Sequence, residues 1–412
     1  MDTRIVANSI VSTKQWKDSQ LVDPVPILKE LVAIPSVNPM GRDLTGNEYF
    51  EGRLTEYLVG YLRRHSIEHE VHEIVPGRAN VLARVDCPRA VRTVLFDAHQ
   101  DTVPTDGMTI PPFTPTERDG RIYGRGSCDV KGGLAAMLAA LTRLANNRHA
   151  GVVNVVLSMT CDEESTSLGI NQLVASWLGS SPKYRLCDAR PDVAIVAEPT
   201  ELDIVVAHRG ATRWKIRTTG RACHSSRPDE GINAIYRMAK VLHHLENYAI
   251  ALPGSRPAHA LCGPATLSVG LIAGGSSVNV VPDSAVIDID RRTIPGENSQ
   301  AVIEEVAAYL RERLDFELIH EAPYCQSAPL GDELNGNLAH QLSRAIERVV
   351  GARQLIGVPF GTHASRIAKA DIPAVVFGPG NIAQAHTKDE WISIDQLRHA
   401  SEIYFQFCTT EL

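Results

Sequence analysis

The stretch Val152–Met159, with the sequence VVNVVLSM, is the most apolar in the first half of the chain, and two adjacent acids, Glu163 and Glu164, follow it. A short apolar run rich in valine is typical of a buried β-strand. Adjacent carboxylates repel each other, and this repulsion is tolerable if a cation lies between them or if one acid must stay basic for chemistry. The stretch therefore predicts a buried strand with chemistry at its carboxyl end.

Helical and strand patterns alternate on both sides of this stretch. Leucines and tyrosines at residues 54–62 follow the spacing of an amphipathic helix, and apolar residues from Leu134 to Leu141 mark another. Further buried strands are expected at residues 92–96, 193–197 and 374–377. Strands separated by helices predict an α/β fold whose main sheet is mostly parallel and covered by helices.

The pattern changes between residues 208 and 320. Residues 212–219 alternate like a half-exposed strand, and residues 266–273 and 285–290 resemble two more. Helices are expected at residues 231–246 and 297–314. This order predicts a small α+β domain, residues 208–320, inserted into a main domain formed by residues 1–207 and 321–412.

Composition narrows the functional class. The 412 residues carry a net charge of −7 without a dense basic cluster, which argues against nucleic acid as a partner. The first twenty residues lack the apolar core of a signal peptide, and no apolar run is long enough to cross a membrane. Eight cysteines without a C-x-x-C pair favour free thiols in a reducing compartment. We therefore expect a cytoplasmic protein with no membrane partner.

Metal-ligand residues follow the expected strands. His99, the pair Glu163–Glu164, Glu198 and His386 come after four of them, and Asp129 lies in a glycine-rich turn. In open α/β sheets, residues at the carboxyl ends of the strands meet in one crevice. Two histidines and three carboxylates suit zinc or a similar divalent ion. Five ligands exceed one tetrahedral site but suit two ions that share one carboxylate.

Asp101 stands two residues after His99, where its carboxylate can accept the second N–H of the imidazole ring. Such an acceptor is the usual support of a metal-bound histidine because it selects one tautomer. We therefore expect Asp101 to orient His99.

The ordered set of motifs resembles the di-zinc metallopeptidases and amidohydrolases that include acetylornithine deacetylase, succinyl-diaminopimelate desuccinylase, aminoacylase-1 and carboxypeptidase G. The matching stretches begin at Asp97, Gly124, Asp162, Ala197 and Ala385 and read DAHQDTVP, GRGSCDVKGG, DEE, AEPT and AHT. The resemblance implies a catalytic α/β domain interrupted by a smaller lid domain that often forms homodimers, with two metal ions, zinc or alternatively cobalt.

The resemblance also implies roles for the ligands. Asp129 would bridge both metals, with His99 and Glu198 on one ion. Glu164 and His386 would bind the other ion, and the peptide bond after Asp129 would be cis. Glu163 would be the general base, because a carboxylate beside metal-activated water can pass its proton to the leaving nitrogen.

The resemblance implies four more candidates, three of them in the inserted domain. His224, in the sequence ACHSS, matches a histidine that stabilises the oxyanion in a partner subunit's site. Asn279 and Arg292 match a pair that holds the substrate carboxylate, for which an arginine fork is suited. Thr362 lies in a substrate-side loop, where His363 replaces an acid that many relatives carry.

The favoured function is hydrolysis of a linear amide in an N-acyl amino acid. An acetylornithine-like substrate is preferred over N-succinyl-diaminopimelate, and both over a di- or tripeptidase or carboxypeptidase activity. A non-catalytic metal-dependent binding protein is the alternative from another class. A nucleotide enzyme is disfavoured because the glycine-rich turn lacks a phosphate-loop lysine and places Asp129 where a phosphate would be repelled.

Overall fold

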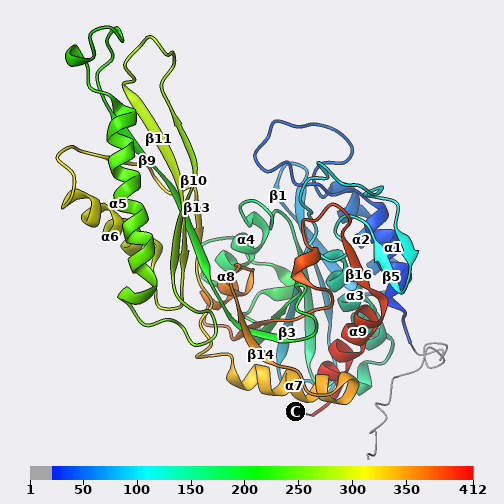
Figure 1. Cartoon of the computed structure of the whole chain (residues 1–412). Helices are drawn as coiled ribbons and strands as arrows, with labels where there is room; N and C mark the ends of the chain where they lie inside the picture. The colour runs from blue at the N-terminus through cyan, green and yellow to red at the C-terminus, as the bar shows by residue number, and fades with distance from the viewer. Residues whose placement is uncertain (1–20, 412) are drawn as a thin grey trace, which may run out of the picture. The chain divides into compact units, whose positions relative to one another are not determined.

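The computed structural model describes residues 21–411, which form two compact units (Figure 1). The first unit comprises the described residues up to Ile204, Gly336–Leu355 and those from Lys369 onward. The second comprises Val205–Asn335 and Ile356–Ala368. Among the helices of residues 21–411, none combines the length and the hydrophobicity needed to cross a lipid bilayer.

The first unit is built on a mixed sheet. Its strands are β1 (Glu68–Val75), β2 (Arg78–Val85), β3 (Thr93–His99), β6 (Asn154–Thr160), β7 (Val193–Val196) and β15 (Ala374–Val376). They lie in the order β1-β2-β6-β3-β7-β15, and β6, β3, β7 and β15 run parallel. The four strands predicted from apolar runs are all present. The predicted α/β class with a mostly parallel, covered sheet is therefore confirmed.

Helices cover this sheet. They are α1 (Pro24–Ala33), α2 (Gly52–Arg64), α3 (Lys131–Asn146), α4 (Leu168–Trp177), α7 (Gly336–Val350) and α9 (Ile394–Thr409), with the 3-10 turns η2 (Arg148–Ala150), η3 (Arg185–Cys187) and η5 (Ile382–Gln384). Helix α3 packs on β3 and β6 and against α1 and α9, so nearly all of it is buried. A small sheet, β16-β5-β4, is formed by Trp391–Ser393, Arg121–Tyr123 and Thr116–Arg118.

The second unit is an antiparallel sheet with helices on one face (Figure 1). Its strands are β9 (Gly210–Thr219), β10 (Thr266–Gly274), β11 (Ser284–Thr293), β12 (Ile319–His320) and β13 (Cys325–Ser327). Helices α5 (Ala234–Ser255) and α6 (Ser299–Arg311) lie on that face. The unit also contains α8 (Ala364–Ala368) and the 3-10 turn η4 (Pro228–Glu230). The core lies between β9, β11, α5 and α6, around the fully buried Trp214.

The helices of this unit differ from the expected ranges at their ends, since α5 begins at Ala234 and α6 is Ser299–Arg311, and two differences are larger. Helix α5 continues nine residues past the expected end at residue 246, because Tyr248 and Leu252 extend its buried stripe. Residues 205–207, 321–335 and 356–368, expected in the main domain, belong to the second unit. Part of the reason is that β13 pairs with β9. Strands β8 (Ile204–His208) and β14 (Leu355–Val358) each span a boundary between the units.

Candidate metal centre

Three adjacent parallel strands place three of the candidate ligands. His99 is the last residue of β3, Glu164 follows β6 by four residues and Glu198 follows β7 by two. The strands are neighbours in the order β6-β3-β7, so their carboxyl ends lie at one edge of the sheet. This edge is where ligand sites form in open α/β sheets.

Asp129 reaches the same edge through the turn between β5 and α3. Gly126 adopts a positive φ of 78°, and a Cβ atom there would lie 2.6 Å from the Thr102 side chain. At Gly133, a Cβ atom would lie 2.7 Å from the Cβ atom of Ala197. The absence of a side chain therefore lets the start of α3 lie against the residue before Glu198. The peptide bond after Asp129 is cis.

The five candidate ligands form two triads that share Asp129. In one triad, ligand atoms of His99, Asp129 and Glu198 lie within 4.8 Å of one another, and in the other those of Asp129, Glu164 and His386 do so. The Nε2 atoms of His99 and His386 lie 3.2 and 3.1 Å from opposite carboxylate oxygens of Asp129. The structure thus brings together all five residues, and each oxygen of Asp129 faces a different histidine.

The electrostatics of this cluster favour a bound cation. Burial and the nearby charge of Asp129 raise the pKa of Glu164 to about 8 and raise the pKa of Glu198 well above its usual value. Burial would also raise the pKa of Asp129, but hydrogen bonds from His386 and His99 outweigh it and lower that pKa. The negative charge of these two glutamates is therefore unfavourable at this site unless a cation lies between the carboxylates.

The burial and the atom types of the five candidate ligands also fit a metal site. Among the residues that the structure describes, none donates a hydrogen bond to the buried Oε1 atom of Glu164. His99, Asp129 and Glu198 are buried, whereas the side chain of His386 is 54% exposed. Imidazole nitrogens and carboxylate oxygens of this kind are the ligands that zinc accepts. The residues present therefore fit two divalent cations around Asp129.

Asp101 differs in detail from the sequence-based expectation. The Nδ1 atom of His99 lies 2.9 Å from the main-chain oxygen of Asp101 but 3.6 Å from its carboxylate, so the main chain is the closer acceptor. The carboxylate instead accepts the amide N–H groups of Glu163 and Glu164, at 3.0 and 3.1 Å. Asp101 therefore holds the backbone of the acid pair.

A buried charge network beneath the acid pair was not foreseen from the sequence. Arg78 donates to Glu51 and to Asp162, the residue before the pair, and Asn38 donates to both Asp162 and Asp101. Arg78 and Glu51 come from segments without any ligand motif. The DEE motif at residues 162–164 was the only sequence signal, and it did not show that Asp162 binds an arginine.

The second unit holds the other four candidates. His224 is exposed, and its Nδ1 atom lies 2.7 Å from the Ser226 hydroxyl. The amide of the next residue, Ser225, donates a hydrogen bond to the main-chain oxygen of Asn279 at 3.0 Å. Arg292 forms a salt bridge with Asp290, at 2.8 Å. Thr362 is buried, and its amide donates to His208. The structure thus brings the His224 and Asn279 loops together, whereas Arg292 and Thr362 have partners of their own.

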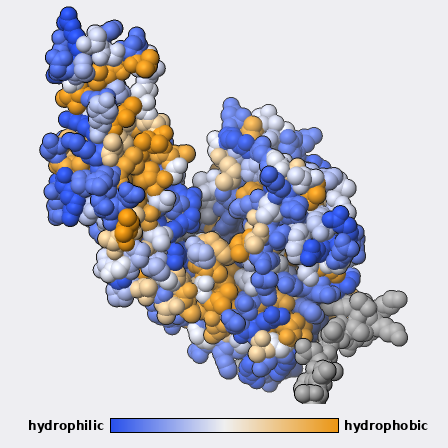
Figure 2. Space-filling view, in the orientation of Figure 1, coloured by the Kyte–Doolittle hydropathy of each residue, from blue (hydrophilic) through white to orange (hydrophobic). Residues whose placement is uncertain are grey.

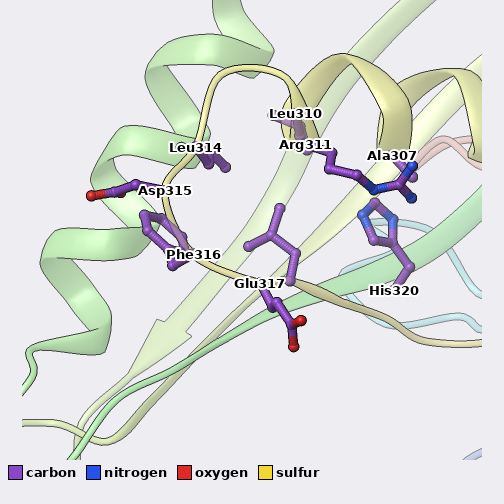
Figure 3. A pocket seen from close by; sticks show the side chains of 9 residues that line it. Ala307, Leu310, Arg311, Leu314, Asp315, Phe316, Glu317 and His320 are labelled. Atoms are coloured by element: carbon purple, nitrogen blue, oxygen red, sulfur yellow. The ribbon is translucent and has the colours of Figure 1, made fainter.

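A pocket of about 460 Å³ lies beside α6 and the segment that leads to β12 (Figure 3). Leu310, Leu314 and Phe316 provide apolar walls, while Arg311 and His320 lie close together on one side. The buried Trp214 indole donates to Nδ1 of His320 at 3.3 Å, which gives this ring a structural role. None of the four candidate residues of the second unit lines the pocket.

The chain is similar to known proteins along most of its length. Residues 95–410 match the model of peptidase family M20/M25/M40. The chain belongs to this family. It is a hydrolase that acts on amides, and the family predicted from its motifs is confirmed.

Individual relatives span nearly the whole chain. Acetylornithine deacetylase of Photorhabdus laumondii is 31% identical over 398 residues, which cover 93% of this chain and 95% of the relative. An M20 family metallo-carboxypeptidase from Sulfolobus solfataricus, Sso-CP2, has a TM-score of 0.73 at 20% identity, covering 94% and 99% of the two chains. The Bacillus subtilis YXEP protein, described as a dinuclear metal binding peptidase, has a TM-score of 0.66 at 17% identity, covering 94% and 96%. The two solved structures show that the fold is shared.

Proposed function

We propose that this protein hydrolyses the linear amide of an N-acyl amino acid with two divalent metal ions. His99 and Glu198 would bind one ion, Glu164 and His386 the other, and Asp129 both. The observation that carries the proposal is the pair of triads around Asp129, in which each carboxylate oxygen faces a different histidine. Zinc is the expected metal and cobalt the alternative, since the ligands are nitrogen and oxygen atoms.

Glu163 is the proposed general base. When bound, two such ions lower the pKa of water and polarise an amide carbonyl. Glu163 would take the proton of the attacking water and donate it to the leaving nitrogen. The hydrogen bonds from the Glu163 and Glu164 amides to Asp101 hold this backbone in place, so Asp101 would orient base and ligand together.

The first unit is proposed as the catalytic domain and the second as the lid. In this assignment His224 stabilises the oxyanion, while Asn279, Arg292 and Thr362 contact the substrate. Arg292 pairs with the carboxylate of Asp290 at 2.8 Å, and a planar guanidinium also suits a substrate carboxylate. A substrate carboxylate would share or displace this partner.

The proposed substrate class is an N-acetylated amino acid of the acetylornithine type. The similarity to acetylornithine deacetylase along nearly the full chain supports this choice over N-succinyl-diaminopimelate and over short peptides. A di- or tripeptidase or carboxypeptidase role is the second candidate, because this chain shares its fold with solved structures of peptidases. A non-catalytic binding role is less favoured, because it needs no basic carboxylate such as Glu163 beside the ligands.

A hydrolysis screen tests this proposal. Metal-stripped protein is supplied with zinc or cobalt and offered N-acetyl amino acids, N-succinyl-diaminopimelate, dipeptides and tripeptides. We expect metal-dependent release of acetate, fastest with N-acetylornithine. If only peptides are hydrolysed, the deacylase assignment is wrong and the peptidase role is favoured. If the protein binds metal stoichiometrically but hydrolyses none of these substrates, the non-catalytic binding role is favoured.

We also propose that the second unit forms a homodimer through β10. This strand is at the edge of its sheet, and its Leu271 and Ile272 side chains are 67% and 59% exposed. Figure 2 shows apolar side chains gathered in this part of the second unit. An unpaired apolar edge strand is a ready template for pairing with another chain, which suits a second copy.

Sedimentation of wild-type protein and two variants tests the dimer. We expect a dimer for wild type and a shift toward monomer for Ile272→Lys. Val91→Lys, at a 91% exposed valine of the first unit, is the matched control and should sediment like wild type. A monomeric wild type would refute this part of the proposal.

The cytoplasm is the proposed location. All eight cysteines are free in the structure, including the six buried ones at positions 87, 128, 161, 187, 262 and 408. Free thiols in this number are typical of proteins kept in a reducing compartment.

A further inference from the structure

One buried carboxylate outside the ligand set binds the turn that carries Asp129. Glu390, which has no exposed surface, lies just before β16. Its Oε1 atom accepts the amide N–H groups of Cys128 and Asp129, at 2.8 and 3.0 Å. Its Oε2 atom accepts the amide of Gly126 at 2.9 Å and the guanidinium of Arg125 at 2.7 Å. Four donors thus converge on one side chain.

These bonds connect the chain segments of two candidate ligands. Asp129 donates its own amide to Glu390, and His386 stands four residues before Glu390. The main chain adds to the connection, because the Gly124 amide donates to the Glu390 carbonyl at 3.0 Å and Trp391 pairs with Tyr123. The positions of Asp129 and His386 relative to each other therefore depend on Glu390.

Only a carboxylate satisfies this arrangement. All four groups are donors, so both oxygens must accept, and the charge of Arg125 offsets the burial of a negative group. A glutamine of the same shape would turn its NH₂ group toward N–H donors and leave some of them unpaired. Loss of a buried acceptor is expensive because the orphaned donors stay out of reach of water.

We propose that Glu390 is a positioning residue, which orients the Asp129 carboxylate between His99 and His386 by binding the amides of its turn. The inference rests on the proposed function, since it assigns Glu390 a role toward the two metal ions. It predicts an effect on metal affinity rather than on the fold as a whole.

Zinc affinity of Glu390→Gln tests the inference, measured by competition with a chromophoric chelator. We expect a loss of about 10–100-fold, the range found when groups that support metal ligands are replaced. Glu390→Asp keeps the charge but shortens the side chain, so an intermediate loss is expected. The absorption bands of the cobalt-loaded variants should also shift, because the ligand geometry changes.

Glu297→Gln is the matched control. Glu297 is a largely buried carboxylate of the second unit that accepts from Arg256 and Arg291 and from the amide of Ile294. It resembles Glu390 in its partners, but it lies outside the ligand set. We expect Glu297→Gln to unfold at a lower urea concentration than wild type but to bind zinc equally tightly. The control thus separates the general effect of removing a buried charge from the proposed effect on the position of Asp129.

The outcomes separate this inference from the proposed function. Wild-type protein that binds fewer than two zinc ions would contradict the proposed function. Two ions bound by wild type and equally tightly by folded Glu390→Gln would overturn the positioning role alone. If Glu390→Gln does not fold, Glu390→Asp decides in the same way. Failure of both variants to fold would also overturn the inference, because Glu390 would then serve the whole fold.

Discussion

Replacing Arg78 with methionine is expected to destabilise the first unit strongly. The Arg78 guanidinium donates to both oxygens of Glu51, at 2.9 Å from Nε to Oε2, and to Asp162 at 2.5 Å. All three side chains are at most 8% exposed. Methionine fills a similar volume but leaves two buried carboxylates without a countercharge.

The magnitude follows from this burial. Removing one partner of a buried ion pair costs about 3–5 kcal/mol, because the remaining charge has neither water nor a partner. The free energy of unfolding of a typical domain is about 5–15 kcal/mol, so the variant would lose a large share of its stability. The exposed pair of Arg185 and Glu68 provides the control, and we expect no measurable loss for Arg185→Met.

The pH dependence of the loss distinguishes this mechanism from poor packing. Burial raises the pKa of Glu51, and Arg78 opposes the rise. In the variant, the folded-state pKa of Glu51 should therefore lie further above its unfolded value of about 4.3. A raised folded-state pKa stabilises the fold at low pH, and this contribution is lost as the pH rises through it. The deficit of Arg78→Met should thus be larger at pH 8 than at pH 5.5.

Urea unfolding followed by circular dichroism measures this deficit. The samples contain EDTA, so that metal binding does not add to the stability. A loss below about 1 kcal/mol at both pH values, or a larger loss at pH 5.5, would refute the assignment of Arg78 as a buried countercharge.

Two further predictions concern the metal centre, and a third concerns the packing of the helix that begins beside it. Glu163→Ala should bind as much zinc as wild type by atomic absorption but lose kcat/KM by about 1000-fold, near 4 kcal/mol of barrier; wild-type turnover would remove Glu163 from the mechanism. Zinc affinity should rise from pH 6 to pH 9, because burial and the charge of the shared aspartate raise the pKa of Glu164 to about 8, and bound zinc must displace that proton. Calorimetry in buffers of different ionisation enthalpy checks this, and heats independent of the buffer would contradict it. Gly133→Ala should lower the free energy of unfolding by about 1–3 kcal/mol, because the added Cβ would lie 2.7 Å from the Cβ atom of Ala197. The control is Gly254→Ala, where the added Cβ has no atom within 4 Å, so thermal unfolding should show no loss of stability.

Local sequence patterns predicted much of this molecule. The valine-rich run became β6, shifted by two residues at its start, and the other three apolar runs became β3, β7 and β15. Three candidate ligands were visible because His99, Glu164 and Glu198 lie at or just after the ends of such strands, and parallel strands bring their carboxyl ends to one edge. The end of α5 was missed, since the apolar stripe beyond residue 246 is interrupted by Pro253 and Gly254.

The sequence by itself determined the central strands β3, β6, β7 and β15, the approximate places of α2, α3, α5 and α6, and the chemical types of the five ligands. Hydrophobic periodicity and residue chemistry are properties of neighbouring positions, so they can be read without the fold. Only the tertiary structure decided which buried charges support those ligands. Arg78 lies 84 residues from Asp162, and Glu390 lies 261 residues from Asp129. Such pairs leave no local pattern, since a charged residue in a sequence does not reveal whether it will be buried. Burial is what turns these distant charges into necessary partners.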